Sequence, residues 1–543
     1  MDQTSLLTRL LDEDNGGSDS AEVSLRGKEE DAGGAVHEQT PPPSHSSGSG
    51  PISPMMYLFC ACAAFNSCIV GYDFGVNVLS ALLVKNTLNL SDLQIAAFLG
   101  ALNGFSMLGA ATTSFISDRF GRRGCFMVTS VAFFCGDLLQ ASAQNYAQLM
   151  TGRSILGVAI GWGLAIDPMY ISEIAPAGRR GFLVSWSEIA INVGITLGLS
   201  SGLVFCQAPD RYAWRYMYAT GAVLPIFMLI LVKFFMPESP RWLLQKGRDD
   251  AAHKVLATLY PENEHEVEAL GYEIKRSIQK EEEAFHPGWN FLLCHPTPAY
   301  KSMLTAGVLA GIAQQVVGID AIGPYQTFIL NDSGVTDRYN QALILLGCEV
   351  LKCIITFGSS RVTDTWGRRP LAFISITGIV VSLFLLAIDF HLSSGATSAL
   401  SIVGIFCYMG SFAAGMGPIS WLVPSEVFTT PIRAKGTSIT TFLNRGVSAI
   451  MAFSFLALQK AVSMSGVFLI LICLSIVMAA LIYHFVPETM GESLEDMAIY
   501  FATLTGDKSV LEYLESEHST EESSHPNATK NAASTRKITH EII

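Results

Sequence analysis

Three short polar motifs occur twice in this chain, each time at the end of an apolar stretch long enough to cross a bilayer. The paired segments are 118–123 (DRFGRR) with 364–369 (DTWGRR), 172–173 (SE) with 425–426 (SE), and 237–239 (PES) with 487–489 (PET). Their offsets are 246, 253 and 250 residues. An internal repeat of this length among hydrophobic spans predicts an all-α membrane protein of two similar halves, an architecture typical of transporters.

Composition supports a membrane protein. Half of the 543 residues are hydrophobic and only 15% are charged, which is too little charge for a soluble protein of this length. The net charge of −13 belongs to two polar tails, because residues 1–50 and 487–543 each carry a balance of −7. We expect both tails to be solvated and disordered. The eleven cysteines show no paired spacing, so they predict neither a disulfide framework nor a metal site.

Twelve runs of about 20 apolar residues are long enough to span a bilayer. They lie near 55–79, 94–117, 124–143, 148–170, 183–206, 215–236, 302–328, 340–361, 370–391, 398–424, 437–459 and 466–486. The predicted organisation is a tail (1–54), a six-helix half (55–236), a linker with amphipathic helices (237–301), a second six-helix half (302–486) and a second tail (487–543).

Basic residues in the short loops predict the orientation. Loops after spans 2, 4, 8 and 10 carry ten Lys and Arg, whereas the opposite loops and span ends carry five. Both termini and the linker are therefore expected in the cytoplasm. The sequons at Asn89 and Asn331 then face outward, where glycosylation occurs, and a third at Asn527 does not.

Several ionisable side chains fall inside the apolar spans, where each costs roughly 2.5–3.5 kcal/mol to insert. Asp73 lies late in span 1 within GYDFG, and Arg153 opens span 4. A buried Asp and Arg offset each other's desolvation only while both are charged, so protonation of Asp73 would release Arg153 and act as a proton switch. A permanent salt bridge near a helix end is the equally weighted alternative. Further candidates are Asp137, Asp167, Glu349 and Lys352.

A second polar group predicts a site for a polyhydroxylated ligand. Its members are Glu188 in span 5, Gln314, Gln315, Asp320 and Tyr325 in span 7, Trp421 in span 10 and Asn444 in span 11. Amides and carboxylates exchange hydrogen bonds with hydroxyls, and an indole face packs on the C–H face of a ring. Two carboxylates facing one cavity disfavour each other's charge, so Glu188 is also a second candidate proton carrier. Packing alone is the alternative interpretation of any single residue in this group.

The repeated loop motifs predict a set of ion pairs at one membrane face. The residues are Asp118, Arg122, Arg123 and Glu173 in the first half and Asp364, Arg368, Arg369 and Glu426 in the second. Such networks are expected to hold an outward-open state and to break as the halves rock. Alternatively, these arginines only set the topology.

These motifs together resemble the sugar porter family of the major facilitator superfamily over roughly residues 55–500. The likeness extends to YISEIAPAGRRG (170–181), PESPRW (237–242), Gln314-Gln315, GPISW (417–421) and PETMG (487–491). It implies twelve helices, a substrate site at the midplane and alternating access. A single chain is the expected functional unit. By the same likeness, Arg153 is the partner of Asp73, and Gln314, Gln315, Trp421 and Asn444 are sugar contacts.

Within that family, the chain is most similar to plant-type polyol and monosaccharide proton symporters. Glu188 and Asp320 stand where hexose carriers usually have Gln and Asn, and Asn444-Arg445 also resembles the polyol branch. Two departures concern the gate and span 1. Pro324 lies three residues earlier than the family's usual proline, and Asn77 replaces a residue that is often apolar.

The sequence therefore predicts a proton-coupled symporter of polyols or monosaccharides, with a sugar or polyol and a proton as its ligands, the bilayer as its surroundings and no nucleic acid partner. An uncoupled facilitator is the nearest alternative, and a non-transporting sugar receptor is a remote one. No nucleophile, metal or nucleotide motif indicates an enzyme, so no cofactor is expected. Plasma membrane is the expected location, although Leu6-Leu7 in an acidic context fits a signal for endosomal or vacuolar membranes.

Overall fold

The computed structural model describes residues 53–176, 179–261, 264–283, 288–392, 398–491 and 494–507. Within these ranges the secondary structure is helical and contains no strand. Residues 1–52 and 508–543, which include the Leu6-Leu7 motif and the Asn527 sequon, lie outside the described residues.

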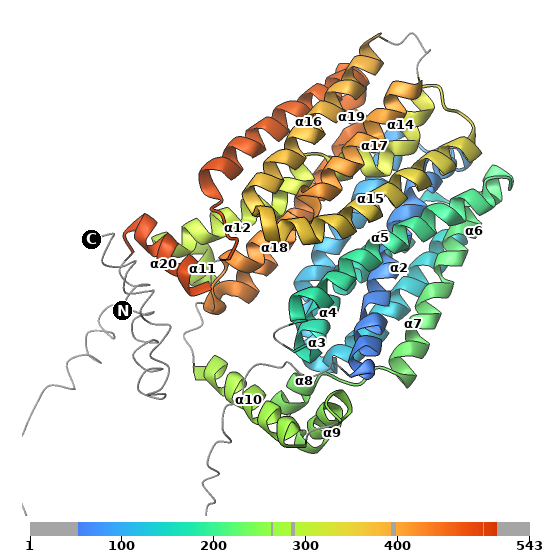
Figure 1. The fold of residues 1–543 in the computed structure, drawn as a ribbon. Helices are drawn as coiled ribbons and strands as arrows, with labels where there is room; N and C mark the ends of the chain where they lie inside the picture. The colour runs from blue at the N-terminus through green and yellow to red at the C-terminus, as the bar shows by residue number, and fades with distance from the viewer. Residues whose placement is uncertain are drawn as a thin grey trace, which may run out of the picture. The chain divides into compact units, whose positions relative to one another are not determined.

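The first half consists of helices that run back and forth across the bundle (Figure 1). They are α2 (Pro54–Thr87), α3 (Asp92–Ala141), α4 (Tyr146–Ile174), α5 (Arg180–Phe205), α6 (Asp210–Gly221) and α7 (Val223–Phe234). Ser53 caps α2 by accepting from the Met55 amide, and a proline at the first helical position favours initiation there. Small residues then allow close packing: a Cβ on Gly71 would lie 2.0 Å from the Ile191 carbonyl oxygen of α5.

The second half repeats this arrangement with more interruptions. Its helices are α12 (Pro298–Val316), α13 (Ile319–Ile322), the 3-10 turn η2 (Gly323–Tyr325), α14 (Gln326–Asp332), α15 (Arg338–Trp366), α16 (Arg368–Leu392), α17 (Ser398–Ala414), α18 (Met416–Val427) and α19 (Thr430–Phe485). Predicted span 7 is broken twice, at Gly318, whose φ is +100°, and at the turn that contains Pro324.

The described residues contain ten helical segments that are long and apolar enough to cross a membrane. Two of them are about twice the required length, because α3 has 50 residues and α19 has 56. Each is interrupted once by a non-helical residue, Gly121 in α3 and Ser463 in α19. Each therefore holds two spans, which confirms the expected fold of twelve transmembrane helices.

Between the halves lie α8 (Pro240–Gln245), α9 (Asp249–Leu259), α10 (Glu264–Glu283) and α11 (Trp289–Cys294). The helices α8, α9 and α10 contact one another, and α8 also contacts α3 and α4 (Figure 1). We call the membrane face that carries them the linker end, and the opposite face, which carries Asn89, the sequon end. The helix α20 (Leu494–Thr505) follows the last span and packs on α12 through its buried Met497, Phe501 and Ala502.

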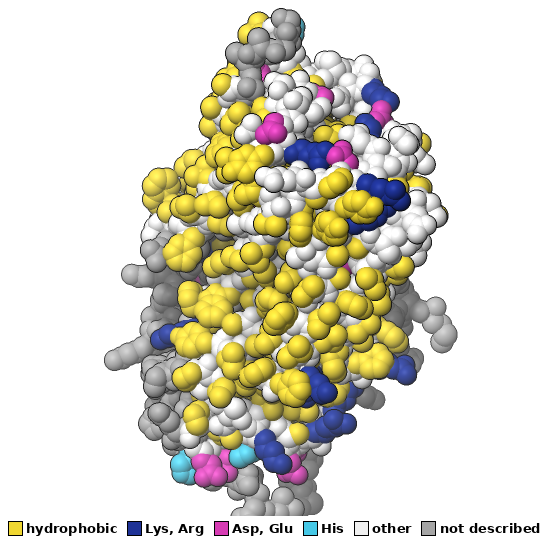
Figure 2. All heavy atoms as spheres, turned by 90° about the vertical axis from the view of Figure 1, so that its right-hand side faces the viewer, with side chains coloured by type: hydrophobic (Ala, Val, Ile, Leu, Met, Phe, Trp, Pro, Cys, Tyr) yellow, Lys and Arg dark blue, Asp and Glu magenta, His cyan; other side chains and the backbone are white. Residues whose placement is uncertain are grey.

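The outer surface of the bundle is apolar. Figure 2 shows hydrophobic side chains over most of one face, with charged side chains gathered toward its two ends. The exposed large apolar residues of α5 to α7 include Val193, Leu197, Val204, Ile226, Phe227, Ile230 and Phe234. A soluble protein rarely exposes so large an apolar surface, whereas a lipid-facing helix requires it.

Candidate functional site

We call the buried polar group around Gln315, where α12, α13 and α19 meet, the central cluster. The orientation of the Gln315 amide that satisfies its neighbours places Nε2 2.8 Å from Asp320 Oδ2 and Oε1 3.2 Å from Arg445 Nη2. Arg445 also donates from Nη2 to Asn444 Oδ1 at 2.7 Å, and Asn444 donates from Nδ2 to the Gly311 carbonyl at 2.6 Å. The structure thus brings together three of the predicted ligand residues around one arginine.

The break in span 7 positions this cluster. The left-handed Gly318 ends α12 and starts α13, so Asp320 lies in the first turn of a new short helix. The Ser448 hydroxyl of α19 donates to Asp320 Oδ2. A broken helix leaves main-chain polar groups unpaired, which is tolerated inside a membrane only where protein or a cavity surrounds them.

Charged residues on α5 of the first half and on α15 of the second half complete the cluster. Glu188 of α5 interacts electrostatically with Lys352, Arg445 and Glu349. The Lys352 ammonium lies 3.0 Å from Glu349 Oε1 on the same helix, α15, and α15 packs on α5. Glu188, Asp320 and Glu349 therefore face two cations, and such a cluster in a membrane core is a candidate functional site.

The remaining predicted ligand residues lie on α12, η2 and α18 and have different surroundings. Gln314 on α12 is buried, and Trp421 on α18 is half-buried. Tyr325 is fully buried: its hydroxyl donates to the Ala452 carbonyl at 2.7 Å, and its ring stacks on Phe455 at 4.5 Å. The hydrogen bond of this tyrosine therefore fastens the broken part of span 7 to α19.

The first half holds a second buried polar group. Asp73 on α2 and Arg153 on α4 are each 1% exposed. Arg153 does not form an ion pair with Asp73 among the described contacts. Its Nη1 donates to Asn77 Oδ1 at 2.5 Å, its Nε donates to the Phe98 carbonyl at 3.0 Å, and its guanidinium lies 4.2 Å from the centre of the Phe98 ring.

Asn77 and Tyr218 are candidate site residues that the sequence analysis did not assign. The Tyr218 hydroxyl donates to Asn77 Oδ1 at 2.9 Å, so Asn77 joins α6 to the arginine of α4. The sequence marked Asn77 only as unusual for an otherwise apolar position. Because Arg153 donates its Nη1 hydrogen bond to Asn77, Asp73 is a buried carboxyl that forms no ion pair among the described contacts.

The first copy of the loop network joins three segments at the linker end. Arg122 Nη2 lies 2.6 Å from Glu173 Oε1, and Arg122 Nε donates to Glu173 Oε2 at 2.9 Å. Glu238 accepts from the Arg122 amide at 2.8 Å. Gly121 makes this turn possible with φ +81° and ψ 172°, a conformation open essentially to glycine alone.

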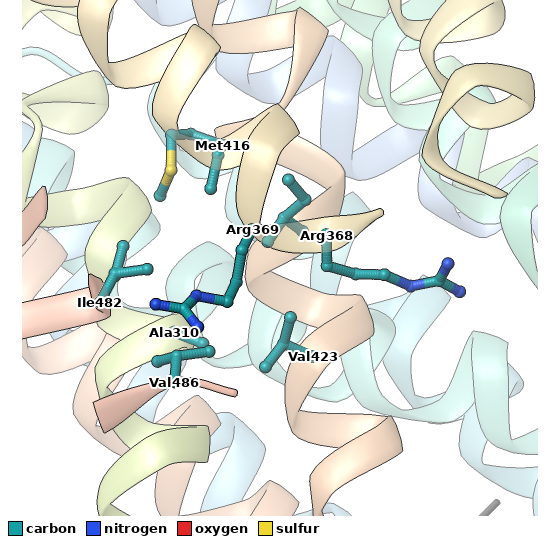
Figure 3. A pocket seen from close by; sticks show the side chains of 9 residues that line it. Ala310, Arg368, Arg369, Met416, Val423, Ile482 and Val486 are labelled. Atoms are coloured by element: carbon teal, nitrogen blue, oxygen red, sulfur yellow. The ribbon is translucent and has the colours of Figure 1, made fainter. Parts of the chain in front are cut away.

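The second copy has the same geometry. Arg368 Nη2 lies 2.7 Å from Glu426 Oε1, and Glu488 accepts from the amides of Arg368 at 2.8 Å and Arg369 at 2.9 Å. Figure 3 shows the two arginines pointing in different directions, with Arg369 directed toward Ile482 and Val486. The pocket drawn there is lined mainly by apolar side chains beside this network.

The other described residues of the predicted network make weaker contacts or contact the backbone. Asp118 is largely exposed, with Oδ1 3.6 Å from Arg122 Nη1. Arg123 and Arg369 reach backbone carbonyls, those of Lys233 at 2.8 Å and Tyr483 at 2.7 Å. The side chain of Asp364 lies outside the described part of the chain. The arginine–glutamate pairs lie within one half each, so in this conformation neither joins the two halves.

The two glutamates that hold the arginine amides have different electrostatic surroundings. Burial raises the pKa of Glu238, against three backbone amides that lower it. Burial also acts on Glu488, but the amides of Arg368, Arg369, Met490 and Thr489 together hold the pKa of this carboxyl below its usual value.

The two predicted outward sequons differ in exposure. Asn89 is exposed in the turn before α3, where Ser91 caps the helix, whereas Asn331 is half-buried in the last turn of α14. No group of three or more potential metal ligands occurs in the described residues.

Comparisons with known proteins agree with this architecture. The family model described as sugar (and other) transporter matches residues 59–501. The chain is 34% identical to putative polyol transporter 1 of Arabidopsis thaliana, over 82% of this chain and 91% of that protein. It is also 34% identical to polyol transporter 5 of the same plant, over 81% of this chain and 85% of that one.

A solved structure shares the fold. The inward-open conformation of the xylose transporter XylE from E. coli superposes with a TM-score of 0.70 at 23% identity, over 82% of this chain and 99% of the other. The match to the family model spans both halves and the linker between them, and the chain accordingly belongs to the sugar (and other) transporter family, as a multi-pass membrane transporter with the major facilitator fold.

Proposed function

We propose that this protein is a proton-coupled symporter that moves polyols or monosaccharides by alternating access. The observation that carries the proposal is the central cluster around Gln315, in which amides, carboxylates and an arginine converge inside the membrane. Linear polyols present vicinal hydroxyls, each able to donate to a carboxylate and accept from a guanidinium or amide. The names of the most similar plant relatives support the same substrate class.

The arrangement of these residues supports a specific role for each. Gln315, Asn444 and Asp320 would contact substrate hydroxyls, Glu188 would contact them from the first half, and Gln314 and Trp421 would line the same space. Tyr325 would position the broken segment of span 7. Binding groups from both halves would tie substrate binding to the relative movement of the halves, which alternating access requires.

The buried carboxyl of Asp73 would carry the proton, and Arg153 would respond to its charge. A charged group that is 1% exposed in a membrane helix requires a functional reason, and Asn77 leaves Asp73 free of a permanent ion pair. Inward movement of one proton releases about 2.3 kcal/mol per 100 mV, enough for roughly 40-fold substrate accumulation before any pH gradient is added.

We further propose that the linker end faces the cytoplasm and that the plasma membrane is the site of action of a single functional chain. The excess of basic residues in the linker-end loops supports this orientation. The exposed Asn89 would then carry glycan outside the cell.

Substrate-evoked currents in oocytes test the proposal. Sorbitol, mannitol, xylitol, myo-inositol, glucose and fructose would be applied at several external pH values, with tracer uptake and surface labelling in parallel. A symporter gives inward current that grows as external pH falls. Asp73→Asn is expected to lose this current while it still reaches the surface. Tracer uptake without current at any pH would instead indicate an uncoupled facilitator.

A further inference from the structure

Two carboxyl groups meet inside the first half of the molecule. Asp73 of α2 is 1% exposed and Asp137 of α3 is 0% exposed. The two side chains lie within hydrogen-bond range of each other, and no other hydrogen-bond partner of either carboxyl is found in the described part of the chain. Two ionised carboxylates only accept hydrogen bonds, so this contact becomes a hydrogen bond only when one of them carries a proton.

Packing closes the surroundings of this pair. A Cβ on Gly221, at the end of α6, would lie 3.2 Å from Asp137 Oδ2 and 3.0 Å from Tyr72 Cε1. The backbone of α6 therefore presses directly against the carboxyl of α3. With both carboxyls buried, water cannot screen their repulsion effectively.

The other titratable groups that interact with the pair come from α2, α4 and α6. They are Tyr72, Arg153 and Tyr218. Both tyrosines have hydrogen-bond partners of their own: Tyr72 donates to the Met217 carbonyl at 2.9 Å, and Tyr218 donates to Asn77 at 2.9 Å. Arg153 is thus the one cation among these groups, and it directs its Nη1 to Asn77.

The charge balance determines what the pair does. One arginine beside one aspartate favours the ionised aspartate and opposes proton uptake at neutral pH. A second carboxylate within hydrogen-bond range has the opposite effect, because two carboxylates that share a site do not readily ionise together. Two carboxyls and one arginine therefore reach electrical balance when a single proton is shared between the carboxyls.

We propose that Asp73 and Asp137 bind the transported proton jointly, with Asp137 as the residue that lets this arginine-containing site load a proton near neutral pH. The inference rests on the proposed proton coupling. On loading, one O–H bond forms at either carboxyl and the proton lies between them. On release, that bond breaks toward the other membrane face and both carboxylates are ionised beside Arg153.

The pH profile of substrate uptake tests the proposal. Asp137→Asn removes the second charge but keeps a polar side chain of the same shape. The external pH of half-maximal uptake is expected to fall by about one unit or more, with maximal uptake retained at acid pH. Asp137→Glu restores two carboxyls and is expected to stay near the wild-type midpoint. Asp137→Ser is expected to lower the external pH of half-maximal uptake in the same way as Asp137→Asn. It is used in place of Asp137→Asn if that variant does not reach the cell surface.

Asp389→Asn is the matched control. Asp389 is another buried membrane aspartate, 3% exposed on α16, and it accepts from the Ser401 hydroxyl away from the pair. Its replacement is expected to leave the midpoint unchanged.

The two possible failures are distinguishable. A wild-type profile that depends on pH, together with an unchanged midpoint in Asp137→Asn or Asp137→Ser, would overturn the joint site, since Asp137 would then be a permanently protonated donor that an amide replaces. Wild-type uptake that does not depend on pH would contradict proton coupling itself, and the shared proton with it.

Discussion

At the scale of single residues, the side chains nearest Asp73 and Arg153 come from several different helices. Asp73 and Arg153 were expected to pair directly, but Asn77 accepts from the arginine and Asp137 lies beside the aspartate. These groups come from three helices, and residue spacing along each helix does not determine which of several nearby acceptors an arginine contacts. In the central cluster, the sequence correctly grouped Gln315, Asp320 and Asn444 as neighbours. It identified Lys352 and Glu349 as charged residues inside spans but did not assign them to this cluster.

Gln315 offers the sharpest test of the central cluster. Gln315→Leu keeps a similar volume but removes the amide between Asp320 and Arg445. Hydrogen bonds to charged groups contribute about 1.5–3 kcal/mol, so the half-saturating polyol concentration is expected to rise roughly 10- to 100-fold. Concentration-dependent tracer uptake measures it.

Gln459→Leu is the control for that substitution. Gln459 bonds Asp332 at 3.0 Å near the sequon end and lies outside the cluster. An equal rise in both variants, or no rise in Gln315→Leu, would contradict the assignment of Gln315 as a substrate contact.

At the scale of helices, hydropathy predicted the spans because bilayer thickness fixes their length. The helix ends were less predictable. Within α3 and α19, only Gly121 and Ser463 have non-helical backbone angles, at the points where one span ends and the next begins. The repeated PES and PET segments proved to hold the glutamates that accept from the amides of Arg122 and Arg368. The helix α20 lies in a stretch expected to be tail, since it is too short to give a membrane-span signal.

The two repeated glutamates are expected to contribute differently to stability with pH. The Glu488 carboxylate has a lowered pKa, so its contribution is present above the unfolded value of about 4.3 and is lost as pH falls through the lower folded value. Glu238 has a raised pKa, so its contribution is present at low pH and declines as pH rises through the folded value.

Thermal unfolding of the detergent-solubilised protein measures this difference. At pH 7.5, Glu488→Gln is expected to lower Tm by on the order of 2 °C and by more than Glu238→Gln does. The difference in Tm between Glu488→Gln and the wild type is expected to become smaller below about pH 4. A larger loss in Glu238→Gln, or a difference in Tm that does not change with pH, would disprove the proposed electrostatic difference between the two copies.

At the scale of the whole molecule, the repeat predicted two halves but not which membrane face they close. The described ion pairs between the two halves lie at the sequon end. Lys460 of α19 pairs with Asp92 of α3, and Arg338 of α15 pairs with Asp210 of α6. Thr327 of α14 also donates to the Val78 carbonyl of α2 at 2.5 Å. One sequence encodes both the outward-open and the inward-open state, so the choice between them depends on small differences in free energy.

Lys460→Gln tests the closure of the sequon end. Loss of this exposed ion pair costs about 0–1 kcal/mol, so the outward-open population is expected to rise and the half-saturating external substrate concentration to fall by up to roughly fivefold at low salt. High salt is expected to reduce the difference.

Lys85→Gln is the matched control, because Lys85 lies 2.5 Å from the same Asp92 but belongs to the same half. If Lys85→Gln lowers the half-saturating external substrate concentration as much as Lys460→Gln does, the charge of Asp92, and not the connection between the halves, controls the affinity.

The proposed function requires protons and substrate to move together. Purified protein in proteoliposomes with an acidic exterior, and equal concentrations of labelled sorbitol, mannitol or xylitol on both sides, tests it most directly. At least one of these polyols is expected to accumulate inside above its starting concentration, and a protonophore or Asp73→Asn is expected to abolish the accumulation. Exchange of label across the membrane without net accumulation, in every gradient applied, would contradict it.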